Sequence, residues 1–167
     1  MPESRDDQTR EPRALAATSV EGRRSSSYPG AFAKGFEGRI KRALGDAFGL
    51  EQFGVNLVTL EPGAMSALRH WHEREDEFIY VLEGELVLVT DAGEQQLGPG
   101  MAAGFRAGTP DGHHLVNRSA APAHYLEVGT RALSDTVDYP DVDLKAVKED
   151  GSWRFTRKDG SPVGDAG

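Results

Sequence analysis

The chemistry in this sequence is concentrated in two histidines and a glutamate, at His70, His72 and Glu77. Side chains two positions apart on an extended strand point to the same face, so the imidazoles of His70 and His72 would lie side by side. Glu77 follows five residues after His72 and directly precedes the apolar segment 78–82. Two imidazoles and a carboxylate are ligands that suit a first-row divalent metal with open coordination positions.

A fourth ligand would come from the pair His113 and His114, which begins 41 residues after His72. Because adjacent residues of a strand point to opposite faces, only one of the two can share a space with the first histidines. Imidazole and carboxylate ligands without a thiolate suit iron(II), manganese, nickel, copper or zinc. The sequence has no cysteine, so disulfides, zinc–thiolate sites and thiol nucleophiles are excluded.

Length and charge restrict the class of protein further. The 167 residues are enough for one domain with a sizeable core. The 27 acidic and 19 basic residues give a net charge of −8, which disfavours nucleic acid or an anionic membrane as a partner. No apolar run approaches the roughly 18 residues of a membrane span, and the N-terminus lacks the layout of a signal peptide. We therefore expect a cytoplasmic protein that binds a small molecule.

The elements that must position the histidines are predicted to be β-strands. Segment 53–60 is apolar and ends at Pro62-Gly63, a pair that stops a strand. The short strands that follow are separated by Gly, Pro and Asp turns every 8 to 12 residues, which is typical of a sandwich or barrel. The expected strands are 39–44, 53–60, 78–82, 85–90, 94–97, 101–105, 113–117 and 124–128.

The chain divides into a barrel and two extensions. Residues 1–30 are expected to be a tail and connector, partly disordered because residues 1–13 carry almost nothing that a core would bury. The barrel is expected over residues 31–133. Residues 134–167 are expected to form an extension that packs on the barrel or on a partner subunit.

Within this extension the sequence predicts little regular structure. Tyr139-Pro140-Asp141 is not expected in a central strand, because proline removes a backbone donor. Residues 143–149 are charged and are expected to form one or two short helical turns. Trp153 and Phe155 lie in an alternating run and are expected to cover a core edge or a neighbouring subunit.

Residues 63–84 resemble the first signature motif of the cupin superfamily. In that motif a glycine and a short spacer precede His-x-His, three or four residues, a glutamate, six residues and a glycine. Here His70, His72, Glu77 and Gly84 have this spacing. One difference is the spacer after Gly63, which has six residues where five is usual.

The second cupin motif is also present, with two departures. Gly100, Gly108, His113 and Asn117 occupy its positions, but Arg106 replaces the usual proline. In addition, four residues separate the second glycine from the histidine, where two are usual. The His-x-x-x-Asn spacing of the motif favours His113 over its neighbour as the fourth ligand.

The resemblance covers roughly residues 53–129 and includes small single-domain bacterial cupins. It implies an all-β double-stranded β-helix, or jelly roll, a homodimer, and one divalent transition metal held by His70, His72, Glu77 and His113. The function expected from it is that of a metal-dependent enzyme on a small molecule, of the oxygenase or the sugar or keto-acid isomerase type. No catalytic residue is assigned. The alternative is a non-catalytic sensor module that binds metal and ligand.

Five residues near the motifs have competing interpretations. Glu75 and Asp76 are expected in a solvated turn, with Glu75 as a fallback ligand. Arg106 either binds an acidic substrate or forms a salt bridge at the rim, and the salt bridge is favoured. Trp71 is interpreted as a packing residue, and His124 as a surface or core-edge residue.

Overall fold

The computed structural model describes residues 14–163, and strands dominate them. The predicted disordered tail, residues 1–13, lies outside the described residues. Two 3₁₀ turns, η1 (Ala17–Ser19) and η2 (Gly30–Ala33), and the four-residue helix α1 (Leu44–Ala47) accompany the strands. The strands are β1 (Arg39–Ala43), β2 (Phe53–Leu60), β3 (Trp71–His72), β4 (Glu77–Glu83), β5 (Leu86–Thr90), β6 (Gly93–Leu97), β7 (Ala102–Phe105), β8 (His114–Val116), β9 (Ala123–Thr130), β10 (Asp135–Tyr139), β11 (Leu144–Glu149) and β12 (Ser152–Thr156).

A five-stranded antiparallel sheet with the order β1-β2-β9-β4-β7 forms one wall of the barrel. Its strands alternate, so that Val58, Ile79 and Tyr125 point to the core while their neighbours point outward. The turn after β4 requires a glycine at position 84. Gly84 has a φ of +80°, and an added Cβ would lie 2.7 Å from the Pro122 carbonyl oxygen.

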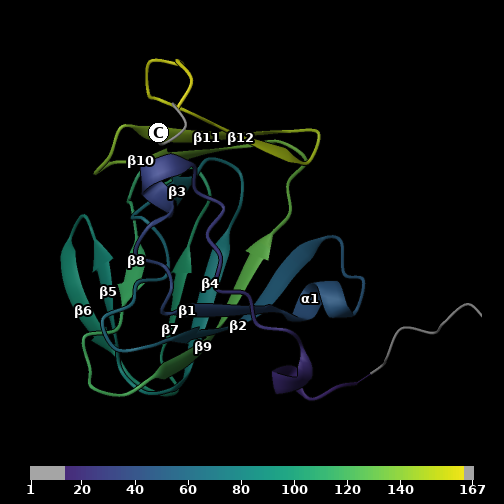
Figure 1. Cartoon of the computed structure of the whole chain (residues 1–167), viewed down its shortest axis with the longest axis vertical. Coiled ribbons are helices and arrows are strands. Elements are labelled where there is room, and N and C mark those ends of the chain that lie inside the picture. The colour runs from purple at the N-terminus through teal and green to yellow at the C-terminus, as the bar shows by residue number, and fades with distance from the viewer. Residues whose placement is uncertain (1–13, 164–167) are drawn as a thin grey trace, which may run out of the picture.

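The opposite wall is a three-stranded sheet with the order β6-β5-β8. Both sheets contribute to one apolar core. It contains Val58, Leu60, Ala64, Ile79, Val81, Leu86, Leu88, Leu97, Leu115, Ala123 and Tyr125. Figure 1 shows the two walls enclosing this space. The all-β jelly roll expected from the sequence is confirmed, and the predicted barrel strands agree with the observed ones to within one or two residues.

A third sheet, with the order β12-β11-β10-β3, lies across one end of the barrel (Figure 1). The two residues of β3 pair with β10, where His72 lies opposite Val137. Behind this sheet, Val137, Tyr139, Leu144 and Ala146 form a second apolar cluster. The pairing connects the histidine motif directly to the C-terminal segment.

Two predictions for the C-terminal segment are wrong. Residues 143–149 were expected to form helical turns, but Leu144–Glu149 is strand β11. Tyr139-Pro140-Asp141 was not expected in a central strand, but Tyr139 is the last residue of strand β10 (Asp135–Tyr139), which lies between β3 and β11. Pro140 itself follows the strand, so its missing donor costs the sheet nothing. No helix among residues 14–163 is long and apolar enough to cross a membrane.

Candidate metal centre

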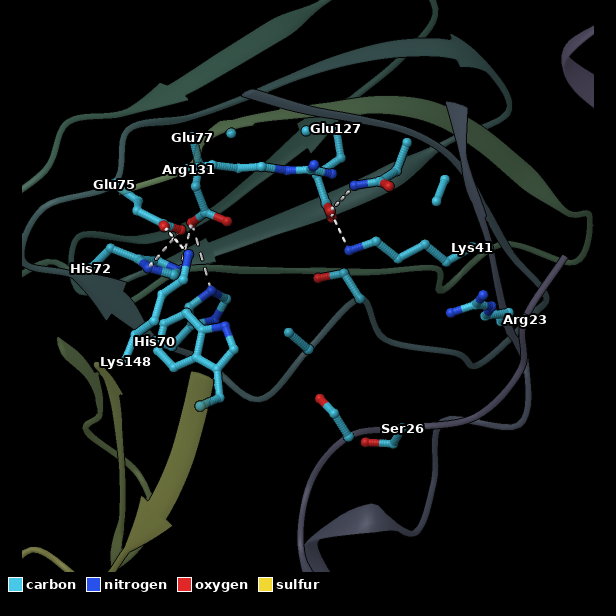
Figure 2. Close-up of a pocket in the computed structure, with 18 of the residues that line it drawn as sticks. Arg23, Ser26, Lys41, His70, His72, Glu75, Glu77, Glu127, Arg131 and Lys148 are labelled. Atoms are coloured by element: carbon cyan, nitrogen blue, oxygen red, sulfur yellow. Dashed lines mark hydrogen bonds and ion pairs between the residues drawn. The ribbon is translucent and has the colours of Figure 1, made fainter. Parts of the chain in front are cut away.

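Backbone pairing brings the two histidine motifs together at the end of the barrel beneath the third sheet. His70 and His113 form an antiparallel bridge, with the N–H of each donating to the carbonyl oxygen of the other at 3.2 and 2.9 Å. His72 lies in β3, and Glu77 is the first residue of β4. Figure 2 shows the imidazoles of His70 and His72 beside Glu77.

The Nε2 atoms of three imidazoles converge on one carboxylate oxygen, Oε2 of Glu77. The distances are 2.9 Å from His113, 3.6 Å from His70 and 3.7 Å from His72. The Glu77 side chain is only 20% exposed. The structure thus brings together all four residues that the sequence predicted as ligands.

The opposite ring nitrogens of two histidines are held by acceptors. Nδ1 of His70 donates to the Leu68 carbonyl oxygen at 2.8 Å, and Nδ1 of His72 donates to Asp135 Oδ2 at 2.6 Å. A proton fixed on Nδ1 leaves the Nε2 lone pair free for a metal, as in most histidine metal sites. The third ring is held by packing, because His113 stacks on Phe105 with ring centroids 3.5 Å apart.

These residues fit a divalent transition metal. Ligand atoms from His70, Glu77 and His113 lie within 4.8 Å of one another, and His72 Nε2 is close to the same carboxylate oxygen. Imidazole nitrogens and a carboxylate oxygen, with two of the rings oriented by outer acceptors, are the donor set of such sites. His114 is not part of this set, because the ligand atoms that lie together come from His70, Glu77 and His113, and the adjacent residue of the chain points to the opposite face.

The charges of the site agree with this arrangement. Burial raises the pKa of Glu77, but contacts with His113 and His70 outweigh burial and hold this pKa well below its usual range. Burial lowers the pKa of His72, yet the hydrogen bond to Asp135 and the nearby carboxylates raise it overall. Glu77 therefore stays a carboxylate, and protons compete with a metal for His72.

A cavity of about 750 Å³ opens beside the ligands. His70, His72, Glu75 and Glu77 lie on one side of it, as Figure 2 shows. Its other lining residues are mostly polar or charged and include Arg23, Arg39, Lys41, Asn56, Glu127, Arg131, Lys148 and Trp153. The size and polarity of this space suit a small polar molecule.

Two residues beside the centre were not predicted in their observed roles. Asp135 has a fully buried side chain and holds His72. Glu75, expected in a solvated turn, is only 12% exposed and forms an ion pair with Lys148 at 2.9 Å. The prediction for Glu75 is wrong because β10 and β11, which were also missed, cover this turn. The alternation of Asp135, Val137 and Tyr139 was the signal that would have predicted a strand there.

Other predicted residues lie away from the ligands or at their edge. Arg106 and Trp71 line a smaller cavity of about 210 Å³ next to His72. The salt bridge expected of Arg106 is not found among residues 14–163. Nδ1 of His124 lies 2.9 Å from Thr59 Oγ1, within the β2–β9 pair.

A jelly roll with three histidines and a glutamate converging at one end defines the class of protein. The chain belongs to the cupin superfamily, and its residues 56–129 match the family model described as a cupin domain. A sugar phosphate isomerase of this superfamily from Silicibacter pomeroyi is 52% identical in sequence. The match covers 90% of this chain and 96% of that one, with a TM-score of 0.87.

Two further solved structures are similar over most of the chain. A candidate sugar phosphate isomerase from Acidithiobacillus ferrooxidans is 31% identical, with 75% of this chain and 80% of that chain covered and a TM-score of 0.69. The polyketide cyclase RemF from Streptomyces resistomycificus is 26% identical, with 71% and 78% covered and a TM-score of 0.59. A comparison with curated proteins found no match.

Proposed function

We propose that this protein is a metal-dependent isomerase of a sugar phosphate, with His70, His72, Glu77 and His113 as the metal ligands. The observation that carries the proposal is the convergence of three imidazole Nε2 atoms on Glu77 Oε2 at the wall of a 750 Å³ cavity. Two similar structures described as sugar phosphate isomerases favour this activity over an oxygenase.

The metal and the protein would divide the chemistry between them. A bound iron(II), manganese, nickel, zinc or copper ion supplies Lewis-acid polarisation of a substrate oxygen. Asp135 keeps the proton of His72 on Nδ1, and Glu77 stays ionised. The walls of the cavity orient the substrate, so that the free energy of binding holds the reacting carbon atoms in the correct position.

Isomerisation of a sugar moves a proton between neighbouring carbon atoms, so a base must face the substrate. We assign this role to Glu127, which lines the cavity from β9. Its Oε1 accepts hydrogen bonds from Lys41 Nζ at 2.6 Å and Asn56 Nδ2 at 3.0 Å. The carboxylate takes a proton from the hydroxyl-bearing carbon next to the carbonyl group, which leaves an enediolate, and returns it to the former carbonyl carbon. The hydroxyl proton of the first carbon passes to the former carbonyl oxygen, so that the carbonyl group and the hydroxyl group exchange places.

Metal analysis of protein purified without oxygen tests the site. We expect close to one equivalent of a transition metal, lost in the variants His72→Ala and Glu77→Gln and retained in the control His124→Ala. Metal-free protein that cannot be reloaded would refute the assignment of the ligands.

Turnover assays then separate an enzyme from a sensor module. The metal-loaded protein is incubated with a panel of aldose and ketose phosphates, and interconversion is followed by NMR. We expect isomerisation of at least one pair, and its loss in Glu127→Gln with metal content unchanged. Stoichiometric binding of a sugar phosphate without product would instead support the non-catalytic sensor.

The homodimer expected from the family resemblance has a suitable surface. Phe53, Phe78, Tyr80 and Leu82 are between 39 and 45% exposed. They belong to β2 and β4 and point away from the core of the five-stranded sheet, because they alternate with its inward residues. Covering such a face removes apolar surface from water at about 25 cal/mol per Å². We propose that two copies of the chain pack through this face.

A further inference from the structure

Three basic side chains face the cavity from one short pair of strand segments. Arg39 and Lys41 are two positions apart on β1, so both point to the same face. Arg23 forms an antiparallel bridge with Lys41, with reciprocal N–H to carbonyl hydrogen bonds of 2.9 Å. All three residues line the 750 Å³ cavity. We call Arg39, Lys41 and Arg23 the cationic row.

The positive charge of the cationic row exceeds the negative charge that the protein places against it. Lys41 forms an ion pair with Glu127 at 2.6 Å. Among residues 14–163, neither Arg39 nor Arg23 has a carboxylate partner. Side chains of like charge directly opposite each other in a strand pair repel, so the row would gain from an anion between its members.

Arg39 has an unused donor at a buried atom. Its two terminal nitrogens donate to the carbonyl oxygens of Ser66 at 2.6 Å and Ser25 at 3.4 Å. Its Nε is buried and has no hydrogen-bond partner. The guanidinium is half-buried and has no counter-ion among the described residues, and bidentate contact with an oxyanion is the geometry that it favours.

The cationic row and the metal ligands line the same cavity. Figure 2 shows Lys41 and Arg23 across the cavity from His70 and His72. Arg39 lies nearer to the metal ligands, since it lines another cavity, of about 170 Å³, together with His70 and His72. The hydroxyl-bearing segment Ser25, Ser26 and Ser27 also lines the cavity and offers further donors for phosphate oxygens.

We propose that Arg39, Lys41 and Arg23 form the subsite that binds the phosphate group of the substrate. This inference rests on the proposed function, because it names which end of the cavity receives each end of a sugar phosphate. The phosphate lies in the cationic row, and the carbonyl end of the sugar lies at the metal ligands beside Glu127. The subsite also selects phosphorylated over free sugars, in a chain whose net charge of −8 otherwise repels anions.

Calorimetric titration of the metal-loaded protein with fructose 6-phosphate, fructose and inorganic phosphate tests the subsite. We expect fructose 6-phosphate to bind at least tenfold more tightly than fructose, and inorganic phosphate to compete with it. The preference should fall about tenfold or more in Arg23→Gln and in Arg39→Gln, and Arg39→Lys should keep part of it. Rising salt should weaken binding of the phosphate but not of fructose.

The matched control is Arg24→Gln. Arg24 is adjacent to Arg23 and loses the same charge, but it forms an ion pair with Glu61 and does not line the cavity. The proposal would be overturned if Arg23→Gln and the charge reversal Arg23→Glu both kept the full preference for fructose 6-phosphate over fructose. It would also be overturned if the wild-type protein bound no phosphate probe.

Metal content is measured on every variant. If the row variants keep their metal and lose phosphate binding, the subsite is supported. If His72→Ala keeps its metal, the metal site fails independently of the subsite.

Discussion

Asp135 Oδ2 accepts a hydrogen bond from His72 Nδ1 at 2.6 Å, and this contact joins the C-terminal sheet to the candidate metal centre. The second carboxylate oxygen accepts from the backbone N–H of Arg74 at 2.8 Å. Burial raises the pKa of Asp135, but these hydrogen bonds outweigh burial and lower it overall. The buried group is therefore a carboxylate that determines which nitrogen of His72 faces Glu77.

Replacing Asp135 by Asn should weaken metal binding by about 10- to 100-fold, because the amide no longer fixes the tautomer of His72. Competition with a chelator of known affinity measures the change. Asp138→Asn is the matched control on the same strand, since residue 138 points to the other face of β10. Equal affinity in the Asp135 and Asp138 variants would show that the carboxylate does not position His72.

The pair His113 and His114 can be separated by substitution. His113 Nε2 contacts Glu77, whereas His114 donates to the Ala67 carbonyl oxygen. We expect His113→Ala to lose most of the bound metal, and His114→Ala to keep it with at most a modest loss of stability. Metal content per protein and thermal unfolding of both variants provide the measurement. Metal lost only from the His114 variant would reverse the assignment.

The stability of the metal-free protein should depend on pH in a specific direction. The raised pKa of His72 means that its stabilising contribution is complete below the ordinary value of about 6.5 and is lost as the pH rises through the folded-state pKa. The lowered pKa of Glu77 has the opposite effect, since its contribution is lost as the pH falls below about 4.3. The metal-free protein should thus be most stable between about pH 4.3 and 6.5.

Metal binding should shift this optimum upward, because the ion displaces the proton from His72 and binds more tightly as the pH rises. Unfolding midpoints from pH 4 to 9, measured with a chelator and with added manganese, show both effects. The decline above about pH 6.5 should be smaller in metal-free His72→Gln. An optimum that is the same with and without metal would contradict this account.

The proposed dimer face gives a separate prediction. Leu82→Glu or Phe78→Glu places a charge where the outer face of β4 would meet a second copy, and the charge cannot be buried without a partner. We expect these variants to be monomeric by sedimentation velocity, with the wild-type chain dimeric. Leu133→Glu, at a residue that is 80% exposed outside the sheet, is the control and should leave the dimer intact.

The sequence predicted the barrel and the four converging residues because both depend on local patterns. The apolar alternation of 53–60 and the turn glycines define strands without reference to distant residues. His70, His72 and Glu77 are likewise close in sequence, since His70 directly precedes β3, His72 ends β3 and Glu77 begins β4.

The outer support of the site could not be predicted in the same way. Asp135 and Lys148 contact His72 and Glu75 across 63 and 73 residues of sequence. The many charged residues in 134–151 were the reason that β10 and β11 were not predicted. A strand whose charged side chains are buried in ion pairs has the same composition as a solvated loop. Only the partner in space shows that such a charge is buried, and no local pattern identifies that partner.

The ion pair of Glu75 with Lys148 should be essential to the folded C-terminal sheet. Their side chains are 12 and 11% exposed, and Lys148 Nζ also lies 5.3 Å from the centre of the Trp153 ring. Lys148→Met leaves the Glu75 carboxylate buried without its counter-ion, which should cost about 3–5 kcal/mol in the free energy of unfolding. Urea denaturation of the metal-free protein measures this loss.

The double variant Glu75→Gln/Lys148→Met removes both charges, and we expect it to recover a large part of the stability lost in Lys148→Met. Recovery requires that the penalty comes from the unpaired carboxylate and not from lost packing on Trp153. If the two single substitutions simply add in the double variant, the coupling between Glu75 and Lys148 is absent and the ion pair does not hold the sheet against the metal centre.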